Sequence, residues 1–434
     1  MRIAMVSEHA SPLAVRTDGA GHGRLGSVDA GGQNVHVHAL AEALARVGHE
    51  VVVHTRRTDP HTPDQVRLPS GVVVDHVPAG PAVELGKDDL LEHMDAFGAV
   101  LRRRWSAPWG ERGDGGAGGR PDVAHAHFWM SGLAALDAGR ALGVPVVQTF
   151  HALGSVKRRH QGAADTSPPS RVALESDLGA QVDRVVATCA DEVRELVALG
   201  VPVTNVDVVP CGVDVRRFAV PDDGSRRPGP PRVLTVSRLV PRKGVDTAIR
   251  ALARVPGPAE LVVAGGPEGT ELAGDPEVAR LRALAADEGV AHRVRFVGRV
   301  GPAAVPELMG DADIVVQLPA YEPFGLVPLE AMASGRPVVA AEVGGLADTV
   351  VDGVTGLHVP PGDPDAAGRA IASLLADPAA RTRLGRAGRA RVMEHYAWDR
   401  VAAATVAVYR DVLDGPARAA AAEPAVADLT GVRS

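Results

Sequence analysis

The chain has 434 residues, of which 45% are hydrophobic and 23% charged, a composition typical of a globular protein large enough for two domains. Its formal net charge of −7 argues against nucleic acid as the main partner, and its two cysteines cannot build a disulfide framework. No stretch reaches the roughly 18 apolar residues that a membrane-spanning helix needs. The N-terminus runs directly into a strand pattern rather than a secretory signal, so we expect a cytoplasmic protein without membrane contact.

Short runs rich in Val and Ile alternate with helical segments rich in Ala, Leu and Arg, which is the pattern of parallel βαβ units. The predicted strands are 2–6, 50–54, 122–127, 145–149 and 183–188 in the first half, and 232–236, 260–264, 294–297, 313–317 and 337–341 in the second. A stretch rich in proline and glycine, at 212–231, separates the two sets. We therefore expect an α/β fold of two facing, doubly wound, Rossmann-like domains, with ligands bound in a cleft between their strand ends.

The loop after the first strand ends in Gly31 and Gly32, shortly before a helical segment at 35–47. Glycines at a helix start let backbone N–H groups and the positive helix end approach a phosphate. The three-glycine dinucleotide fingerprint is missing, and a purely structural turn is the alternative. Both glycines are candidate phosphate-binding residues.

His125 and His127 alternate on one predicted strand, so both imidazoles point to the same face. Local spacing offers no third ligand, which argues against zinc. His127 ends the strand and is placed to hydrogen-bond a sugar hydroxyl, and His151, past the next strand, is a second candidate. We interpret the other histidines, including His36 and His38, as helix-surface or packing residues.

Cations follow the first strand of the second half, in the turn from Ser237 to Gly244. Charge builds on the bridging oxygen of a pyrophosphate leaving group as a glycosidic bond breaks, and cations stabilise that charge. Arg238 and Lys243 are the candidates for this role, and solvated charges at a helix entry are the alternative reading.

The segment from Glu322 to Glu330 places one carboxylate in a loop and a second in the helix that follows. A carboxylate only accepts hydrogen bonds, so it suits the hydroxyls of a donor sugar and the two vicinal hydroxyls of a ribose. Phe324 and Gly325 allow backbone N–H groups to approach a ligand closely. The two carboxylates can therefore serve both ends of one sugar nucleotide.

The sequence shows no nucleophile elbow, metal motif, P-loop or pair of acid/base carboxylates. The candidates suit stabilisation of a leaving diphosphate, which indicates group transfer rather than hydrolysis. We expect no metal and no cofactor, since the sugar nucleotide is a co-substrate.

Over about residues 1–412 the chain resembles the retaining GT-B glycosyltransferases of family four. The resemblance rests on the Glu322–Glu330 segment, the Arg238–Lys243 turn, the glycine pair and the run 343–357, in the expected order. It is greatest toward the branch that contains mycothiol glycosyltransferase and sucrose-phosphate synthase, through segments 31–37, 125–132, 150–157 and 171–175. The implied organisation is an acceptor-binding domain at 1–212, a nucleotide-sugar domain at 213–395, a helix at 396–414 that returns to the first domain, and a disordered tail at 415–434.

For the nucleotide, the resemblance implies a backbone contact from Gly32 to the donor phosphate and neutralisation of the diphosphate by Arg238 and Lys243. Glu330 would hold the ribose, and a preference for uridine follows from the resemblance alone. Members of the family retain the anomeric configuration, by front-face attack in which the departing phosphate oxygen accepts the acceptor's proton. No protein nucleophile is then required.

For the donor sugar, the resemblance implies that Glu322 holds its hydroxyls and that His127 contacts it near the reacting end. Phe324, Gly325 and Leu326 would give backbone contacts. These assignments, like those for the nucleotide, are carried over from the family to matching positions of this sequence.

Members of the branch bind phosphorylated acceptors through scattered Lys, Thr and Arg residues. Lys87, Thr149 and Arg171 stand in comparable contexts here. The chain departs from the mycothiol enzymes at His36, where they commonly carry tyrosine, and in the glycine-rich insert at 110–119, so the acceptor stays open.

The expected activity is transfer of a hexose or N-acetylhexosamine from a nucleoside-diphosphate sugar, with UDP preferred, to a small hydroxylated acceptor such as an inositol or sugar phosphate. A lipid, polysaccharide or natural-product acceptor is an alternative. A sugar-nucleotide epimerase and a non-enzymatic sugar-nucleotide sensor are alternatives of other classes. A homodimer also stays open.

Overall fold

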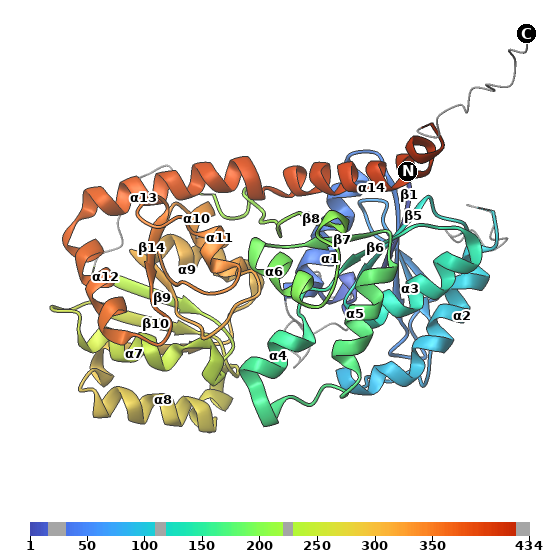
Figure 1. Ribbon diagram of the computed structural model, residues 1–434. Coiled ribbons are helices and arrows are strands. Elements are labelled where there is room, and N and C mark those ends of the chain that lie inside the picture. The colour runs from blue at the N-terminus through green and yellow to red at the C-terminus, as the bar shows by residue number, and fades with distance from the viewer. Residues whose placement is uncertain (16–31, 109–118, 220–228, 422–434) are drawn as a thin grey trace, which may run out of the picture.

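Two β-sheets form the two halves of the protein (Figure 1). The computed structural model describes residues 1–15, 32–108, 119–219 and 229–421. Gly31, a predicted phosphate-binding residue, lies outside these ranges. Within them, no helix combines the length and the apolar character that crossing a membrane requires.

The N-terminal sheet has eight strands in the order β3-β4-β2-β1-β5-β6-β7-β8, and all neighbours are parallel except β3 and β4. Its strands are β1 Arg2–Val6, β2 Glu50–Arg56, β3 Gln65–Arg67, β4 Val73–Val77, β5 Val123–His127, β6 Val146–Thr149, β7 Arg184–Ala187 and β8 Val206–Val208. Its helices are α1 Gly32–Arg46, α2 Met94–Trp105, α3 Trp129–Leu142, α4 Gly154–Gln161, α5 Arg171–Gln181 and α6 Ala190–Ala198.

The C-terminal sheet has six parallel strands in the order β11-β10-β9-β12-β13-β14. Its strands are β9 Arg232–Val236, β10 Glu260–Ala264, β11 Val294–Gly298, β12 Ile314–Gln317, β13 Val338–Ala341 and β14 Gly356–Val359. The helices that follow β9 are α7 Val245–Ala253, α8 Pro276–Asp287, α9 Val305–Asp311, α10 Leu326–Ala333, α11 Leu346–Thr349, α12 Pro364–Ala376, α13 Pro378–Arg391 and α14 Trp398–Ala421. Every strand predicted from the sequence is present, whereas β3, β4, β8 and β14 were not predicted.

Each sheet has an apolar cluster on both of its faces, which explains the unbroken apolar sequences of the central strands. Along β1, Ile3 and Met5 belong to one cluster, and Ala4 and Val6 to the other. Because successive side chains of a strand point to opposite faces, both faces of the sheet must be covered by helices.

The strand order of each sheet reverses beside its first strand, between β1 and β5 in one sheet and between β9 and β12 in the other. Doubly wound sheets bind ligands at such switch points, outside the carboxyl ends of the strands. His127 closes β5, the Arg238–Lys243 turn follows β9, and Glu322 follows β12. The topology therefore positions the predicted residues of both halves where such folds bind ligands.

The last helix, α14, packs on the N-terminal sheet although it follows the C-terminal sheet in sequence (Figure 1). Trp398 and Tyr409 join the same apolar cluster as Leu40 of α1. Tyr409 is fully buried, and its hydroxyl lies 2.7 Å from Nδ1 of His125. The helix continues past residue 414, where the sequence analysis ended it, to Ala421, because an Ala-rich sequence favours helix over a disordered tail.

The unpredicted strand β4 carries a charged residue, Asp75, into the interior. Nδ1 of His54 lies 2.7 Å from Asp75, and Arg104 forms an ion pair with the same carboxylate. Trp105 donates to Nε2 of His54 at 3.1 Å, which fixes the proton of that ring on Nδ1. Burial opposes the charge of Asp75, but the His54 hydrogen bond and the neighbouring charges lower the pKa of Asp75 to about 2.

Replacing Tyr409 by alanine is expected to lower the free energy of unfolding by about 3–5 kcal/mol, because it removes a fully buried ring between α14 and the sheet. Tyr409→Phe keeps the ring and removes only the hydroxyl contact with His125, which costs about 1 kcal/mol. Urea unfolding followed by circular dichroism measures both values. Equal losses in the two variants would contradict the packing role of α14.

Candidate functional site

The two halves of the protein meet where two helices begin. A Cβ atom on Gly32, the first residue of α1, would lie 3.2 Å from Cδ1 of Leu326, the first residue of α10. Gln33 donates from its side chain to the carbonyl of His127 at 3.3 Å, which joins the start of α1 to the end of β5. Gly325 precedes α10 with a φ of +90°, and a Cβ there would overlap a neighbouring leucine. The starts of two helices therefore lie close together, and α10 has no side-chain cap, so the positive helix ends favour a bound anion.

Lys243 forms an ion pair with Glu322, so the structure brings together two predicted site residues from distant parts of the sequence. The two side chains are only 15% and 17% exposed. The turn that carries Lys243 ends at Gly244, which has a φ of +69°. A Cβ on Gly244 would overlap the carbonyl of Leu318, just after β12, so this close backbone contact sets the two partners beside each other.

Two arginines accompany this ion pair. Arg238 is exposed, and Arg242 is half-buried. Burial and the positive charge of Arg238 lower the pKa of Arg242, while the charge of Glu322 opposes that shift. Arg238 and Lys243 were predicted from the sequence, whereas Arg242 was not, although its place beside Lys243 was a usable signal. Three cations with one carboxylate leave a positive excess at this edge of the sheet, which suits a diphosphate.

Glu330 lies one turn into α10, partly buried and without a hydrogen-bond or ion-pair partner among the residues that the structure describes. Burial raises the pKa of its carboxyl to about 7, although the charge of Arg217 opposes the shift. When it is ionised, the Glu330 carboxylate has no hydrogen-bond donor among the described residues. Vicinal hydroxyls of a ribose would supply two of them.

The loop between Glu322 and α10 is held through its carbonyl oxygens. The carbonyl of Glu322 accepts from the N–H of Gly345 at 3.0 Å, and that of Phe324 accepts from the hydroxyl of Thr349 at 3.3 Å. The ring of Phe324 is 6% exposed and packs near Tyr396. Phe324 therefore anchors the loop in the core, and only its backbone is available for the ligand contact predicted from the sequence.

Contacts between the two halves flank Glu322 on both sides. The ring of Tyr321 stacks on His160 of α4, with centroids 4.7 Å apart. The carbonyl of Pro323 accepts from the thiol of Cys189 at 3.3 Å. The position of the Glu322 carboxylate therefore depends on how the halves meet.

Four histidines of the described chain gather at the end of the N-terminal sheet. Nδ1 of His127 lies 3.0 Å from Nε2 of His151, and their rings stack with centroids 5.2 Å apart. The ring of His125 lies 4.2 Å from that of His127, which confirms that the two strand positions share a face. His36 of α1 approaches both His127 and His151, with centroid distances of 5.6 and 4.9 Å. The structure adds His36, which the sequence analysis placed among surface and packing residues, to the cluster around His127.

Burial lowers the pKa of every member of this histidine cluster. The pKa of His36 falls to about 4 and that of His125 to about 3. Burial and the repulsion of neighbouring positive charges hold the pKa values of His127 and His151 well below the ordinary range. All four rings are therefore neutral near pH 7, and each offers one N–H donor and one lone pair.

Two of the three predicted acceptor residues meet over the ring of Phe128. Nζ of Lys87 lies 3.8 Å from the ring centroid, and the guanidinium carbon of Arg171 lies 5.1 Å from it. Phe128 has a φ of +81°, an uncommon value outside glycine that often marks functional sites. The third residue, Thr149, is buried, and its hydroxyl lies 2.9 Å from Nε2 of His125. The Thr149 hydroxyl thus contacts the histidine cluster.

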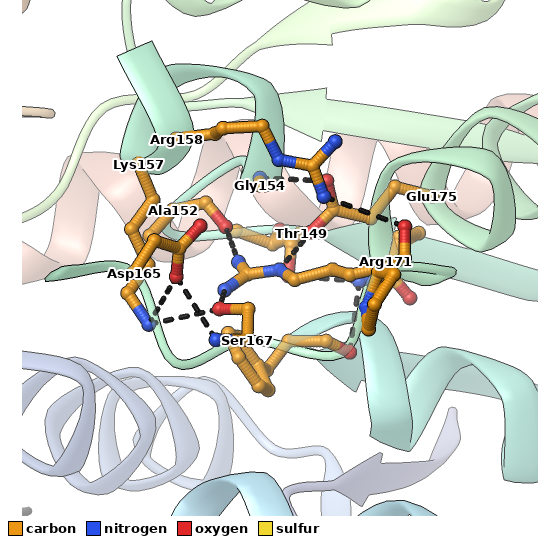
Figure 2. A network of polar contacts seen from close by, with 12 residues as sticks. Thr149, Ala152, Gly154, Lys157, Arg158, Asp165, Ser167, Arg171 and Glu175 are labelled. Carbon is orange, nitrogen blue, oxygen red and sulfur yellow. Dashed lines mark hydrogen bonds and ion pairs between the residues drawn. The ribbon is translucent and has the colours of Figure 1, made fainter. Parts of the chain in front are cut away.

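Arg171 is held from three sides (Figure 2). Its Nε donates to Glu175 at 2.7 Å, its Nη2 to the carbonyl of Ala152 at 2.6 Å, and its Nη1 to the hydroxyl of Ser167 at 3.2 Å. Glu175 also accepts from the N–H of Gly154 at 2.7 Å, yet burial prevails and raises the pKa of Glu175. Since a guanidinium has five N–H groups, one on each terminal nitrogen of Arg171 is left over.

The chain matches two family descriptions that together cover most of its length. Residues 30–217 match "Glycosyltransferase Family 4", and residues 219–391 match "Glycosyl transferases group 1". It is 40% identical over 427 residues to a D-inositol 3-phosphate glycosyltransferase of Acidothermus cellulolyticus, with 95% of this chain and 90% of that protein covered.

Solved structures share the fold. A sucrose-phosphate synthase from Thermosynechococcus elongatus matches with a TM-score of 0.79 and 30% identity, covering 96% of this chain and 100% of that one. Anabaena HepE in complex with UDP-glucose matches with a TM-score of 0.67 and 19% identity, covering 96% of this chain and 100% of that one.

Glu330→Gln is expected to raise the free energy of unfolding of the ligand-free protein by about 1–3 kcal/mol near pH 8 and to change it little near pH 4. Below the ordinary carboxyl pKa, Glu330 is protonated in both the folded and the unfolded chain. Between the ordinary carboxyl pKa and the folded pKa of about 7, the unfolded chain ionises while the folded parent keeps its proton, so the stability of the parent falls with pH across this window and is level above it. Urea unfolding of both proteins across this range measures the difference, and a difference that does not vary with pH would contradict the raised pKa.

Proposed function

Because the chain belongs to glycosyltransferase family 4, whose fold is GT-B, we propose that it transfers a hexose or N-acetylhexosamine from a UDP-sugar to a phosphorylated inositol or a sugar phosphate. The enzyme class follows from the family. The nucleotide, the sugar and the acceptor are the proposed part, and the names of the relatives support a phosphorylated acceptor.

The observation that carries the proposal is the meeting of the starts of α1 and α10 beside the Lys243–Glu322 pair. Two helix ends and three cations converge there, and a diphosphate is the part of a sugar nucleotide that requires such an environment. Stabilisation is most effective where charge develops during the reaction. We assign Lys243, Arg238 and Arg242 to the departing diphosphate and Gly32 to a backbone contact with it.

The two carboxylates bind the parts of the donor on either side of the diphosphate, the sugar and the ribose. Glu322 is already ionically paired with Lys243, so it can accept sugar hydroxyls while its charge stays balanced. Glu330, four residues into the helix from Leu326, meets the ribose, whose hydroxyls satisfy a carboxylate that otherwise lacks donors. The loop from Phe324 to Leu326 joins these two contacts.

The reaction proceeds with retention and without a protein nucleophile. The acceptor hydroxyl attacks the face that the diphosphate leaves, and the departing phosphate oxygen takes the hydroxyl proton. His127 is neutral and donates or accepts one hydrogen bond to the sugar near the reacting carbon. No metal or cofactor is part of the proposed reaction.

The acceptor phosphate binds beside Phe128. Lys87 contributes a mobile point charge, and Arg171 contributes the N–H groups that its three internal hydrogen bonds leave over. The rigid hold on Arg171 keeps those N–H groups in place before the acceptor arrives, which lowers the entropic cost of binding.

An epimerase and a sensor are distinguished from this function by their products. An epimerase converts the donor without any acceptor, and a sensor binds the donor and releases nothing. The direct test measures nucleoside-diphosphate release from UDP-, GDP- and ADP-sugars, each with water, inositol, inositol phosphate and hexose phosphates. Release that needs a phosphorylated acceptor supports the proposal, and release that is equal with inositol and with its phosphate refutes the assigned acceptor class.

Lys243→Met is expected to lower kcat by about 100- to 1,000-fold at saturating donor, because it removes a cation that stabilises the departing diphosphate. Arg280→Met, which removes a cation paired with Glu277 on the surface of α8, serves as the charge-matched control and should keep its rate. The readout is acceptor-dependent release of nucleoside diphosphate. A Lys243 variant with a raised donor KM and the parental kcat would refute the role in the chemical step.

Lys87→Met is expected to raise KM for a phosphorylated acceptor by about 10- to 100-fold, because charged hydrogen bonds contribute about 1.5–3 kcal/mol. The donor KM and the rate with an unphosphorylated analogue should change little. Arg159→Met is the control, since Arg159 is exposed and pairs with Glu195 outside the network that holds Arg171. Equal effects on phosphorylated and unphosphorylated acceptors would contradict a phosphate contact.

A further inference from the structure

Three histidines from separate elements converge within the cluster around His127. One nitrogen each from His36, His127 and His151 lies within 4.8 Å of the other two. His36 comes from α1, His127 from the end of β5, and His151 from the loop after β6. Among the described residues, no Cys, Asp, Glu or further His joins this group of ligand atoms.

Two buried nitrogens of this trio have no hydrogen-bond partner. Nδ1 of His36 and Nε2 of His127 are inaccessible to solvent, and neither is paired within the described chain. His36 is 5% exposed and His127 fully buried, so water does not satisfy them from the surface. Buried polar atoms are normally paired, so an unpaired one needs an explanation, and an ion bound by the trio would provide a partner for Nδ1 of His36.

The spacing of the trio fits one metal ion. Two nitrogens on a tetrahedral zinc, with bonds of about 2.0–2.1 Å, lie about 3.3 Å apart. Nδ1 of His127 and Nε2 of His151 are 3.0 Å apart and share one hydrogen bond, which an ion bound by both nitrogens would replace. The ligand atom of His36 lies within 4.8 Å of the other two, so His36 must approach further to bind the same ion.

We propose that His36, His127 and His151 form a binding site for one divalent cation of the zinc, cobalt or nickel class, and that its occupation inhibits sugar transfer. Imidazole ligands select these ions over magnesium and calcium, which prefer oxygen. The inhibitory effect rests on the proposed function, because it sequesters His127, whereas the metal site itself does not.

The number and type of the ligands fit an open metal site. All three are imidazoles from different elements, and each can offer one ring nitrogen to an ion. Three protein ligands leave a fourth position for water or an anion, as in open zinc sites. Because His151 is only partly buried, it gives the ion a route from solvent.

The nearby charges partly compensate each other. Lys87 raises the electrostatic potential at His151 and opposes a cation. Glu8 is buried, pairs with His9, and lies close enough to Lys87 for the two charges to interact. The carboxylate therefore reduces the repulsion that Lys87 exerts on a bound cation.

Binding is tested by titrating the chelator-treated full-length protein with Co²⁺, whose visible absorption reports nitrogen ligands in tetrahedral geometry, and then displacing it with Zn²⁺. We expect one saturable Co²⁺ per chain. His36→Phe, which keeps a ring against Trp398, and His151→Gln should each weaken the affinity by about 100-fold or more. His395→Gln, at an exposed histidine, is the matched control and should bind as the parent does.

The absence of a saturable site in the parent, or a site that survives in both ligand variants, would overturn the proposal. Circular dichroism verifies that each variant is folded, and the stoichiometry and spectrum of the parent test the site without any variant. Inhibition is measured separately, as nucleoside-diphosphate release with and without Zn²⁺ relative to each protein's own metal-free rate. Zn²⁺ that binds without inhibiting would overturn the inhibitory role, and a bound metal in a protein that releases no diphosphate would refute the transferase function alone.

Discussion

The close approach of backbones at two glycines is the constraint on which the donor side of the site depends. Gly244 lies against the carbonyl of Leu318, and Gly344 against the carbonyl of Glu322, whereas Gly32 meets only the end of the Leu326 side chain. Gly244 and Gly344 also have positive φ values, which other residues rarely adopt. Without the two backbone contacts, the turn that carries Lys243 and the loop that carries Glu322 would not lie side by side, and their ion pair would not form.

The site combines groups that are satisfied with groups that are not. Lys243 and Glu322 balance each other, and Arg171 is tied by three hydrogen bonds, so these side chains are rigid before any ligand arrives. Nε2 of His127 is buried without a partner, and the partly buried Glu330 carboxylate has no donor among the described residues. Rigid groups lower the entropic cost of binding, and polar groups without partners gain hydrogen bonds from a ligand. Together they give the site affinity and fix the orientation of the ligand.

The strands missed by the sequence analysis show where local pattern fails. The β4 sequence contains Asp75 and His76, and such polar residues argue against a buried strand when only the sequence is known. In the structure, Arg104 and His54 come from other segments and pair with the Asp75 carboxylate. The strands β3 and β8 each have only three residues at the edges of the sheet, too short for a periodic signal. The central strands of both sheets were predicted because burial on two faces requires an apolar run, which is visible in any window of sequence.

The sequence by itself determined the α/β class, the two strand sets, the glutamate segment and the cationic turn, because each of these is written in a short stretch of neighbouring residues. Only the tertiary structure decided that Lys243 pairs with Glu322, that Arg171 donates to the carbonyl of Ala152, and that His36 joins His127 and His151. The histidines come from segments far apart in the chain, and no local spacing relates them. Their meeting follows from parallel strands, whose carboxyl ends collect at one edge of the sheet whatever their separation in sequence.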